Sequence, residues 1–196
     1  MANDSSAAGY ITPLVAPGYD AALDAILQGA VVGITGLPGN LVRPRWQPEP
    51  PIQPDFNTDW CALGVTRSTP DVFSYDRHDP IGNGGNGQTF VEEDELLTVL
   101  HSFYGPDSSL NCELFRKGLM ITQNRDVLAS NGIYLVEVQE AIILPALLKE
   151  KWVRRVDATV IYRRRTSTSY AILNLQQSQV TIGNDSFSET ANVTNP

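Results

Sequence analysis

One histidine of the chain lies among carboxylates, in the run Asp76-Arg77-His78-Asp79. Carboxylate and imidazole groups are common ligands of divalent metals, and they also serve as general acids and bases. Adjacent side chains on an extended chain point in opposite directions, however, and Arg77 interrupts the group. A polar loop tip is the favoured interpretation, and a small metal-dependent hydrolase using Asp76, His78 and Asp79 remains the alternative.

A second cluster of ionisable side chains is the acidic run Glu92, Glu93, Asp94 and Glu95. Glycosidase chemistry requires two carboxylates held across a cleft in different environments, whereas consecutive acidic residues are typical of a solvated flank. The other histidine, His101, lies in an apolar strand pattern, which favours burial. The glycines of residues 33–40 lack the Lys-Ser or Lys-Thr of a phosphate-binding loop and favour a turn. We therefore predict no catalytic residue, metal or cofactor.

Basic residues are concentrated in one part of an acidic chain. The 196 residues carry a net charge of −8, yet residues 149–165 hold seven of the fourteen lysines and arginines against two acidic residues. This polarity favours contacts between unlike protein surfaces, including copies of the chain itself. A DNA-binding module using the segment from Arg154 to Arg165 is a further alternative, because guanidinium groups bind phosphates well.

Hydrophobic periodicity predicts a helix from about Tyr19 to Val31 and a central strand from Leu96 to Phe103. Gly105-Pro106 breaks this strand. A second helix follows, with Asp107 or Ser108 as its N-cap and an apolar face formed by Leu110, Cys112, Leu114, Phe115 and Leu119.

After this helix, Gly132 suits the left-handed residue that ends a helical segment, and Ile133–Val138 resumes an extended pattern. Strands Trp60–Thr66 and Asp71–Arg77 are predicted to form a hairpin around Ser68-Thr69-Pro70. Pro145 favours a loop or a broken helix over Glu140–Leu148.

Trp152–Arg163 alternates clearly as a strand. A turn over Arg164–Ser169 and a return from Tyr170 to Ile182 would complete a long C-terminal hairpin, with Arg163, Arg164 and Arg165 at its tip.

These elements predict an α+β fold: a mostly antiparallel sheet with helices packed on one side. Residues 1–18 are expected to form a flexible arm, residues 19–182 a single domain, and residues 183–196 a polar tail. Residues 41–59 are rich in proline and flanked by Trp46 and Trp60, which predicts an extended arm. A docking motif for a proline-binding domain is the alternative for that segment.

Both cysteines, Cys61 and Cys112, lie in apolar runs, which predicts buried thiols and no disulfide. The N-terminus does not resemble a secretory signal, and no uninterrupted apolar stretch has the roughly 18 residues that a membrane helix needs. We expect a soluble protein, made in a reducing cytoplasm and not associated with a membrane.

Two segments resemble signatures of the neck and tail-terminator proteins of tailed bacteriophages. The first is LVRPRWQPEPP, followed by Trp60 and Gly64, and the second is SFYGPDSSLNCELF. The order of predicted elements is similar over roughly residues 19–182.

This resemblance implies a structural virion protein of the neck, not an enzyme. It would form a ring, expected to be hexameric, that terminates the tail and joins it to the head connector. Its partners would be itself, the tail tube or sheath protein, and connector or neck proteins, with DNA passing through the bore without sequence-specific binding. The expected subunit or partner contacts are Arg43, Arg45, Trp46, Arg154, Arg155, Arg163, Arg164 and Arg165, and the expected acidic bore residues are Glu92, Glu93, Asp94 and Glu95.

Overall fold

The computed structural model describes residues 3–47, 52–71, 73–148, 150–175, 177–184 and 187–194. Packing of Cα atoms divides the chain into two compact units. The larger unit consists of Pro17–Ser74 and Glu93–Thr166, and the smaller consists of Met1–Ala16, Tyr75–Glu92 and Ser167–Pro196. The elements in chain order are β1 (Pro13–Val15), α1 (Ala21–Thr35), η1 (Gly39–Leu41), β2 (Val42–Pro44), β3 (Trp60–Pro70), β4 (Tyr75–Asp79), η2 (Asn83–Gly85), β5 (Gln88–Tyr104), α2 (Ser108–Gly118), α3 (Thr122–Ala129), β6 (Ile133–Leu148), β7 (Lys151–Tyr170), β8 (Gln177–Asn184) and β9 (Phe187–Thr194).

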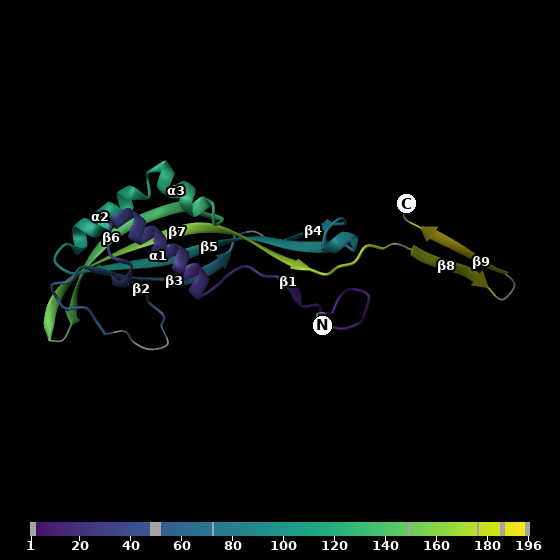
Figure 1. The fold of residues 1–196 in the computed structure, drawn as a ribbon, viewed down its shortest axis with the longest axis horizontal. Coiled ribbons are helices and arrows are strands. Elements are labelled where there is room, and N and C mark those ends of the chain that lie inside the picture. Colours follow the sequence, from purple (N-terminus) through teal and green to yellow (C-terminus); the bar gives the residue numbers. More distant parts are fainter. Residues whose placement is uncertain are drawn as a thin grey trace. The chain divides into compact units, whose positions relative to one another are not determined.

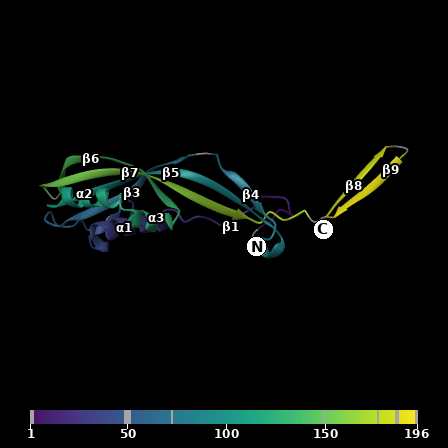
Figure 2. The same cartoon turned by 90° about the horizontal axis from the view of Figure 1, so that it is seen from above.

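In the larger unit the sheet order is β6-β7-β5-β3-β2, so β6 and β2 are its opposite edges. β3 runs antiparallel to β5, β6 runs antiparallel to β7, and β2 runs parallel to β3. The helices α1, α2 and α3 cover one face of this sheet, as Figures 1 and 2 show. The predicted α+β class, with a mostly antiparallel sheet and helices on one side, is confirmed.

The core lies between this sheet and its helices. Leu23, Leu27 and Val31 recur every four residues and are buried, so α1 packs with one face on the sheet. Phe115 from α2 and Phe103 from β5 have ring centroids 5.9 Å apart. The predicted first helix and central strand are therefore present. α1 begins at Ala21 instead of Tyr19 and ends at Thr35, beyond Val31, and β5 is longer than predicted at both ends.

In the smaller unit, β4 pairs with the Gln88–Glu92 part of β5, and β1 pairs with Ser169 and Tyr170 of β7. β8 and β9 form a separate antiparallel hairpin. This pairing places a C-terminal hairpin at residues 177–194, later in the chain than predicted. It also places a strand within residues 183–196, which were expected to form a tail. The predicted domain boundaries stay a prediction.

Several local predictions were wrong because edge and polar strands resemble loops in sequence. Ser68-Thr69-Pro70 is the end of β3 and pairs with β5, so β3 and β4 do not form a hairpin with each other. Glu140–Leu148 continues β6, because an edge strand tolerates Pro145. Arg164–Ser169 continues β7, so Arg163, Arg164 and Arg165 lie within a strand and not at a hairpin tip.

The turn after β5 depends on Gly105, which has φ of +109°. Its Cα faces the 58–59 segment, where an added Cβ would lie 2.4 Å from Asp59 Oδ1 and 2.7 Å from the carbonyl oxygen of Thr58. Asp59 Oδ1 accepts a hydrogen bond from the Asp107 N–H at 2.8 Å. Asp107 occupies the N-cap position of α2, but its own side chain makes no capping hydrogen bond, contrary to expectation.

Replacing Gly105 with alanine should therefore lower the free energy of unfolding by about 1–3 kcal/mol, because it adds backbone strain and a clash. Urea unfolding followed by circular dichroism measures this loss. Gly39→Ala is the matched control, since an added Cβ there meets nothing within 4 Å. Equal stability of the two variants would show that the turn does not need a glycine.

Candidate assembly surfaces

Asp76, His78 and Asp79, the residues of the alternative hypothesis of a metal-dependent hydrolase, all lie on β4. Their side chains do not converge on a common site. His78 Nδ1 lies 3.0 Å from Thr89 Oγ1, and His78 Nε2 lies 2.8 Å from Asn174 Oδ1. Asp79 Oδ1 accepts a hydrogen bond from the Ile81 N–H at 3.1 Å. Across the described ranges, three or more histidine, cysteine or acidic side chains nowhere group as metal ligands. The histidine here connects β4 to β5 and to the segment that follows β7.

Two of the three consecutive arginines of β7 form exposed ion pairs with carboxylates of neighbouring segments. Arg165 Nε and Nη2 donate to the two Asp94 oxygens at 3.0 and 3.1 Å, and hydrogen bonding to Arg165 lowers the pKa of Asp94. Arg163 pairs with Asp71, which follows β3. These arginines remain partly exposed, but their charge is compensated within the chain.

The third arginine, Arg164, points to the opposite face of β7 and is buried with Glu95, at 7% and 8% exposure of the two side chains. Arg164 Nη1 donates to Glu95 Oε1 at 3.2 Å, and Arg164 Nη2 donates to the Gly18 carbonyl oxygen. Ser68 Oγ donates to Glu95 Oε2 at 2.7 Å. A guanidinium held this way is unavailable to a partner, so Arg164 has an internal structural role.

The acidic run at the start of β5 is consequently not one continuous acidic surface. Because side chains alternate along a strand, Asp94 and Glu95 point to opposite faces. Glu92 Oε1 accepts hydrogen bonds from Arg77 Nε and Nη2 at 3.3 and 3.1 Å. Three of the four predicted bore carboxylates therefore have basic partners, and Glu95 is interior.

Arg45 and Arg155 converge on Ser102. Arg45 Nη2 lies 2.7 Å from Ser102 Oγ, and Arg155 Nη2 lies 3.4 Å from the same oxygen. Arg155 also donates to both Asp157 oxygens at 2.8 and 2.7 Å, and its guanidinium lies 5.6 Å from the centre of the Tyr104 ring. This cluster joins β5 and β7 to the segment after β2, so Arg45 and Arg155 help to hold the sheet together.

The other predicted contact residues of the proline-rich segment differ in availability. Arg43 donates to the carbonyl oxygens of Asn40 and Ile52 at 2.8 Å each, which fixes the start of this segment. Trp46 is 68% exposed, and part of its ring lies over Gly64 of β3, where an added Cβ would be 3.4 Å from Trp46 Nε1. Residues 48–51 lie outside the described residues.

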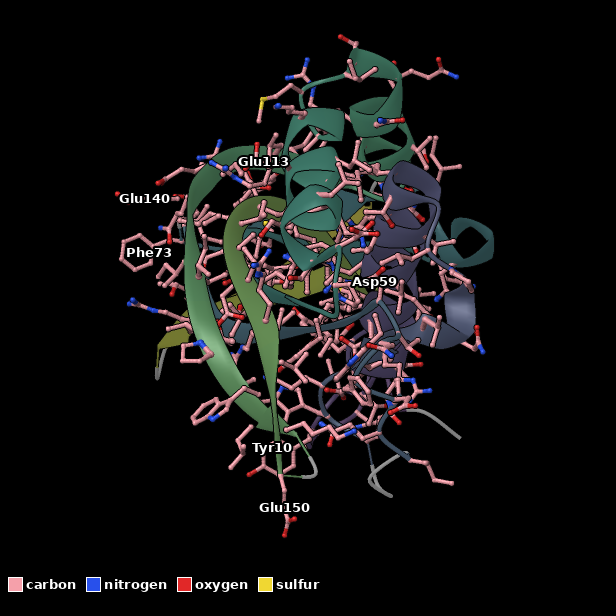
Figure 3. All side chains as sticks on the ribbon, turned by 90° about the vertical axis from the view of Figure 1, so that its left-hand side faces the viewer. Tyr10, Asp59, Phe73, Glu113, Glu140 and Glu150 are labelled. Atoms are coloured by element: carbon pink, nitrogen blue, oxygen red, sulfur yellow. The ribbon has the colours of Figure 1, made fainter. Side chains whose placement is uncertain are left out.

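An exposed apolar surface that was not predicted lies near the turn of the β6–β7 hairpin. Leu147 pairs with Trp152 and Pro145 pairs with Arg154, so these side chains share one face with Ile143, four residues before Leu147. Ile143 is 68% and Trp152 is 73% exposed. We call Ile143, Pro145, Leu147, Trp152 and Arg154 the outer hairpin face. Figure 3 shows Glu150 at the free tip of this hairpin, pointing away from the helices.

At the opposite edge of the same sheet, a groove of about 770 Å³ runs between the start of α1 and the segment that follows β2. Its lining is largely apolar, with two carboxylates at one side. Burial raises the pKa of Asp24, and the nearby charge of Asp20 raises it further. We call this the α1–β2 groove, and its defining residues are Tyr19, Asp20, Asp24, Pro44, Trp46 and Val65.

Three titratable side chains of the core have pKa values that burial shifts away from their ordinary range. His101 is fully buried beside Phe115, and burial lowers its pKa to about 4, against a smaller raising effect of the backbone of Ala158 and Val99. Burial raises the pKa of Cys61 and raises that of Cys112 to about 11. Both cysteines are free, as predicted.

These features define an α+β scaffold in which four of the five arginines of β7 pair with carboxylates of the same chain. Its distinctive exposed surfaces suit contacts with other proteins. The sequence model of the phage neck terminator protein family matches residues 21–186. The chain belongs to this family, which makes it a structural component of the phage neck and hence of the virion, associated with other neck and tail proteins. The comparison with curated proteins found no match. In the described part of the chain, no helix is long and apolar enough to cross a membrane.

Sequence reasoning missed the outer hairpin face and the α1–β2 groove. The signal for the outer hairpin face was present in the sequence as the apolar run Ala141–Leu147. A loop, which is what we predicted there, does not require such a run. The groove has no comparable signal, because Tyr19 and Trp46 are separated by a helix and meet only through the packing of α1 beside β2.

Proposed function

We propose that this chain is a non-enzymatic structural protein that forms a ring at the phage neck, terminates the tail and joins it to the head connector. Membership of the phage neck terminator family carries the proposal. Its partners are further copies of itself, the tail tube or sheath protein, and connector or neck proteins. Synthesis in the host cytoplasm precedes assembly.

The exposed apolar surface on β6 supports self-association. β6 is a long edge strand, and its side chains from Ile142 to Pro145 are exposed. Long, apolar edge strands are aggregation sites unless another chain covers them. A neighbouring subunit in a closed ring provides such cover at every copy.

Passage of DNA through the bore is supported by the overall charge of −8, since an acidic wall repels phosphates and does not retain them. Glu92, Glu93 and Asp94 remain our candidates for this wall, and Glu95 does not, because it is buried. Arg43, Arg45, Trp46, Arg154, Arg155, Arg163 and Arg165 remain candidate contacts; of these, Trp46 and Arg154 are the exposed residues for which the described structure gives no internal ionic or hydrogen-bonded partner.

Purified chain should assemble into a hexameric ring with a central opening. Native mass spectrometry measures the number of chains, and negative-stain microscopy images the opening. Mixed with tails from a neck-deficient lysate, the ring should add density at one tail end. A chain that stays monomeric at all concentrations and leaves tail ends unchanged would contradict the proposed function.

A further inference from the structure

We propose that neighbouring copies contact each other by placing the outer hairpin face of one chain in the α1–β2 groove of the next, with Arg154 beside Asp24. This inference rests on the proposed ring and identifies the two surfaces that build it. The occupant of the groove is thus a second copy of this chain.

The positions of the two surfaces fit a head-to-tail contact. The outer hairpin face belongs to β6 and β7, and the groove lies beside β2, at the other edge of the same sheet. Two different patches on opposite edges form a heterologous interface, which leaves one free patch at each end of any open chain and closes into a ring when the rotation permits. A contact between two identical patches would stop at a dimer.

The apolar side chains of the two surfaces are complementary in kind. The hairpin presents an exposed tryptophan, Trp152, with Ile143 and Leu147 on the same face. The groove presents Tyr19, Pro44 and Trp46, and Trp46 is 68% exposed. Pro44 has no N–H group, so β2 cannot accept a full additional strand, and the contact uses side chains. Large aromatic side chains are enriched at the centres of protein interfaces.

The charges of the two surfaces are opposite. Arg154 is exposed and has no acidic partner among the described residues. In the groove, Asp24 is half-buried near Asp20, and the raised pKa of Asp24 reflects both burial and that like charge. Arg45, the cation that lines this groove, donates to Ser102. An incoming Arg154 guanidinium places a positive charge beside these two carboxylates, for which the described residues form no ion pair.

Two single charge reversals, Arg154→Glu and Asp24→Arg, test this contact. Each variant alone places like charges together at every interface, so its self-association should weaken at least about tenfold. An equimolar mixture restores opposite charges when the two variants alternate around the ring. Native mass spectrometry should therefore show rings with equal numbers of both variants, and neither variant should form rings by itself.

Matched controls are Arg125→Glu and Asp126→Arg, which make the same charge changes at exposed positions of α3. Both controls should assemble like the wild type, and rescue in the mixture shows that the test variants are folded. Suppose that the wild type forms rings. If the single variants then also form rings, or if their mixture does not recover them, the proposed contact is wrong, although the proposed ring is not. A wild-type chain that never self-associates would overturn both.

Discussion

Replacing Arg164 with methionine should lower the free energy of unfolding by about 3–5 kcal/mol, because it leaves the Glu95 carboxylate buried without its cation. The two side chains are 7% and 8% exposed, so water cannot replace the missing guanidinium. The Gly18 carbonyl oxygen also loses its donor. Urea unfolding, followed by both fluorescence and circular dichroism, measures the loss.

The neighbouring arginine provides the control. Arg163 is half-exposed and pairs with Asp71 at the surface, so Arg163→Met should cost about 1 kcal/mol or less. The double variant Arg164→Met with Glu95→Met should recover most of the loss, since removing both charges leaves neither one unpaired. Equal effects of the two single arginine variants would show that the Arg164–Glu95 pair is accessible to water.

Acid should destabilise the chain through His101. Its pKa in the folded state, lowered to about 4 by burial, lies below its ordinary value of 6.5. Between these values the unfolded chain binds more protons, so stability rises with pH through this window and is lost as pH falls from about 6.5 towards 4. The loss attributable to this residue is about 3 kcal/mol at the lower limit.

His101→Leu removes the titrating ring from the core and should flatten the pH dependence of the unfolding free energy between about pH 4 and 6.5. His78→Gln removes the other histidine and keeps His101, so it should retain the wild-type slope. Denaturant titrations at several pH values provide the comparison. A wild-type slope in the leucine variant would mean that His101 does not determine acid stability.

The elements of the core were predictable from sequence, because burial on one face gives a regular period. Leu23, Leu27 and Val31 indicate α1, and the apolar alternation from Leu97 to Phe103 indicates β5. Strands whose residues are polar on both faces gave no such period. The second half of β7, with its run of arginines, threonines and serines, therefore resembled a turn although it is strand to Tyr170.

The candidate surfaces were less predictable, since they depend on which segments become neighbours. Arg163, Arg164 and Arg165 are adjacent in sequence, but alternation along β7 places Arg164 inside and the other two outside. Arg154 and Trp46 were expected contacts on the basis of residue type and remain proposals. Alternation along the predicted strand already places Arg154 on the same face as Trp152, but only the pairing of β6 with β7 shows that Leu147 shares this face.

The reactivity of the two cysteines can report local unfolding of the core. Cys61 and Cys112 are the only thiols, both are buried, and burial raises the pKa of each, which suppresses the reactive thiolate. A thiol reagent must wait for the packing of β3 and α2 to open before it reacts. The alkylation rate of the unmodified protein thus measures how often local unfolding exposes these thiols. The measurement needs no engineered label and applies to the single chain and to an assembled ring.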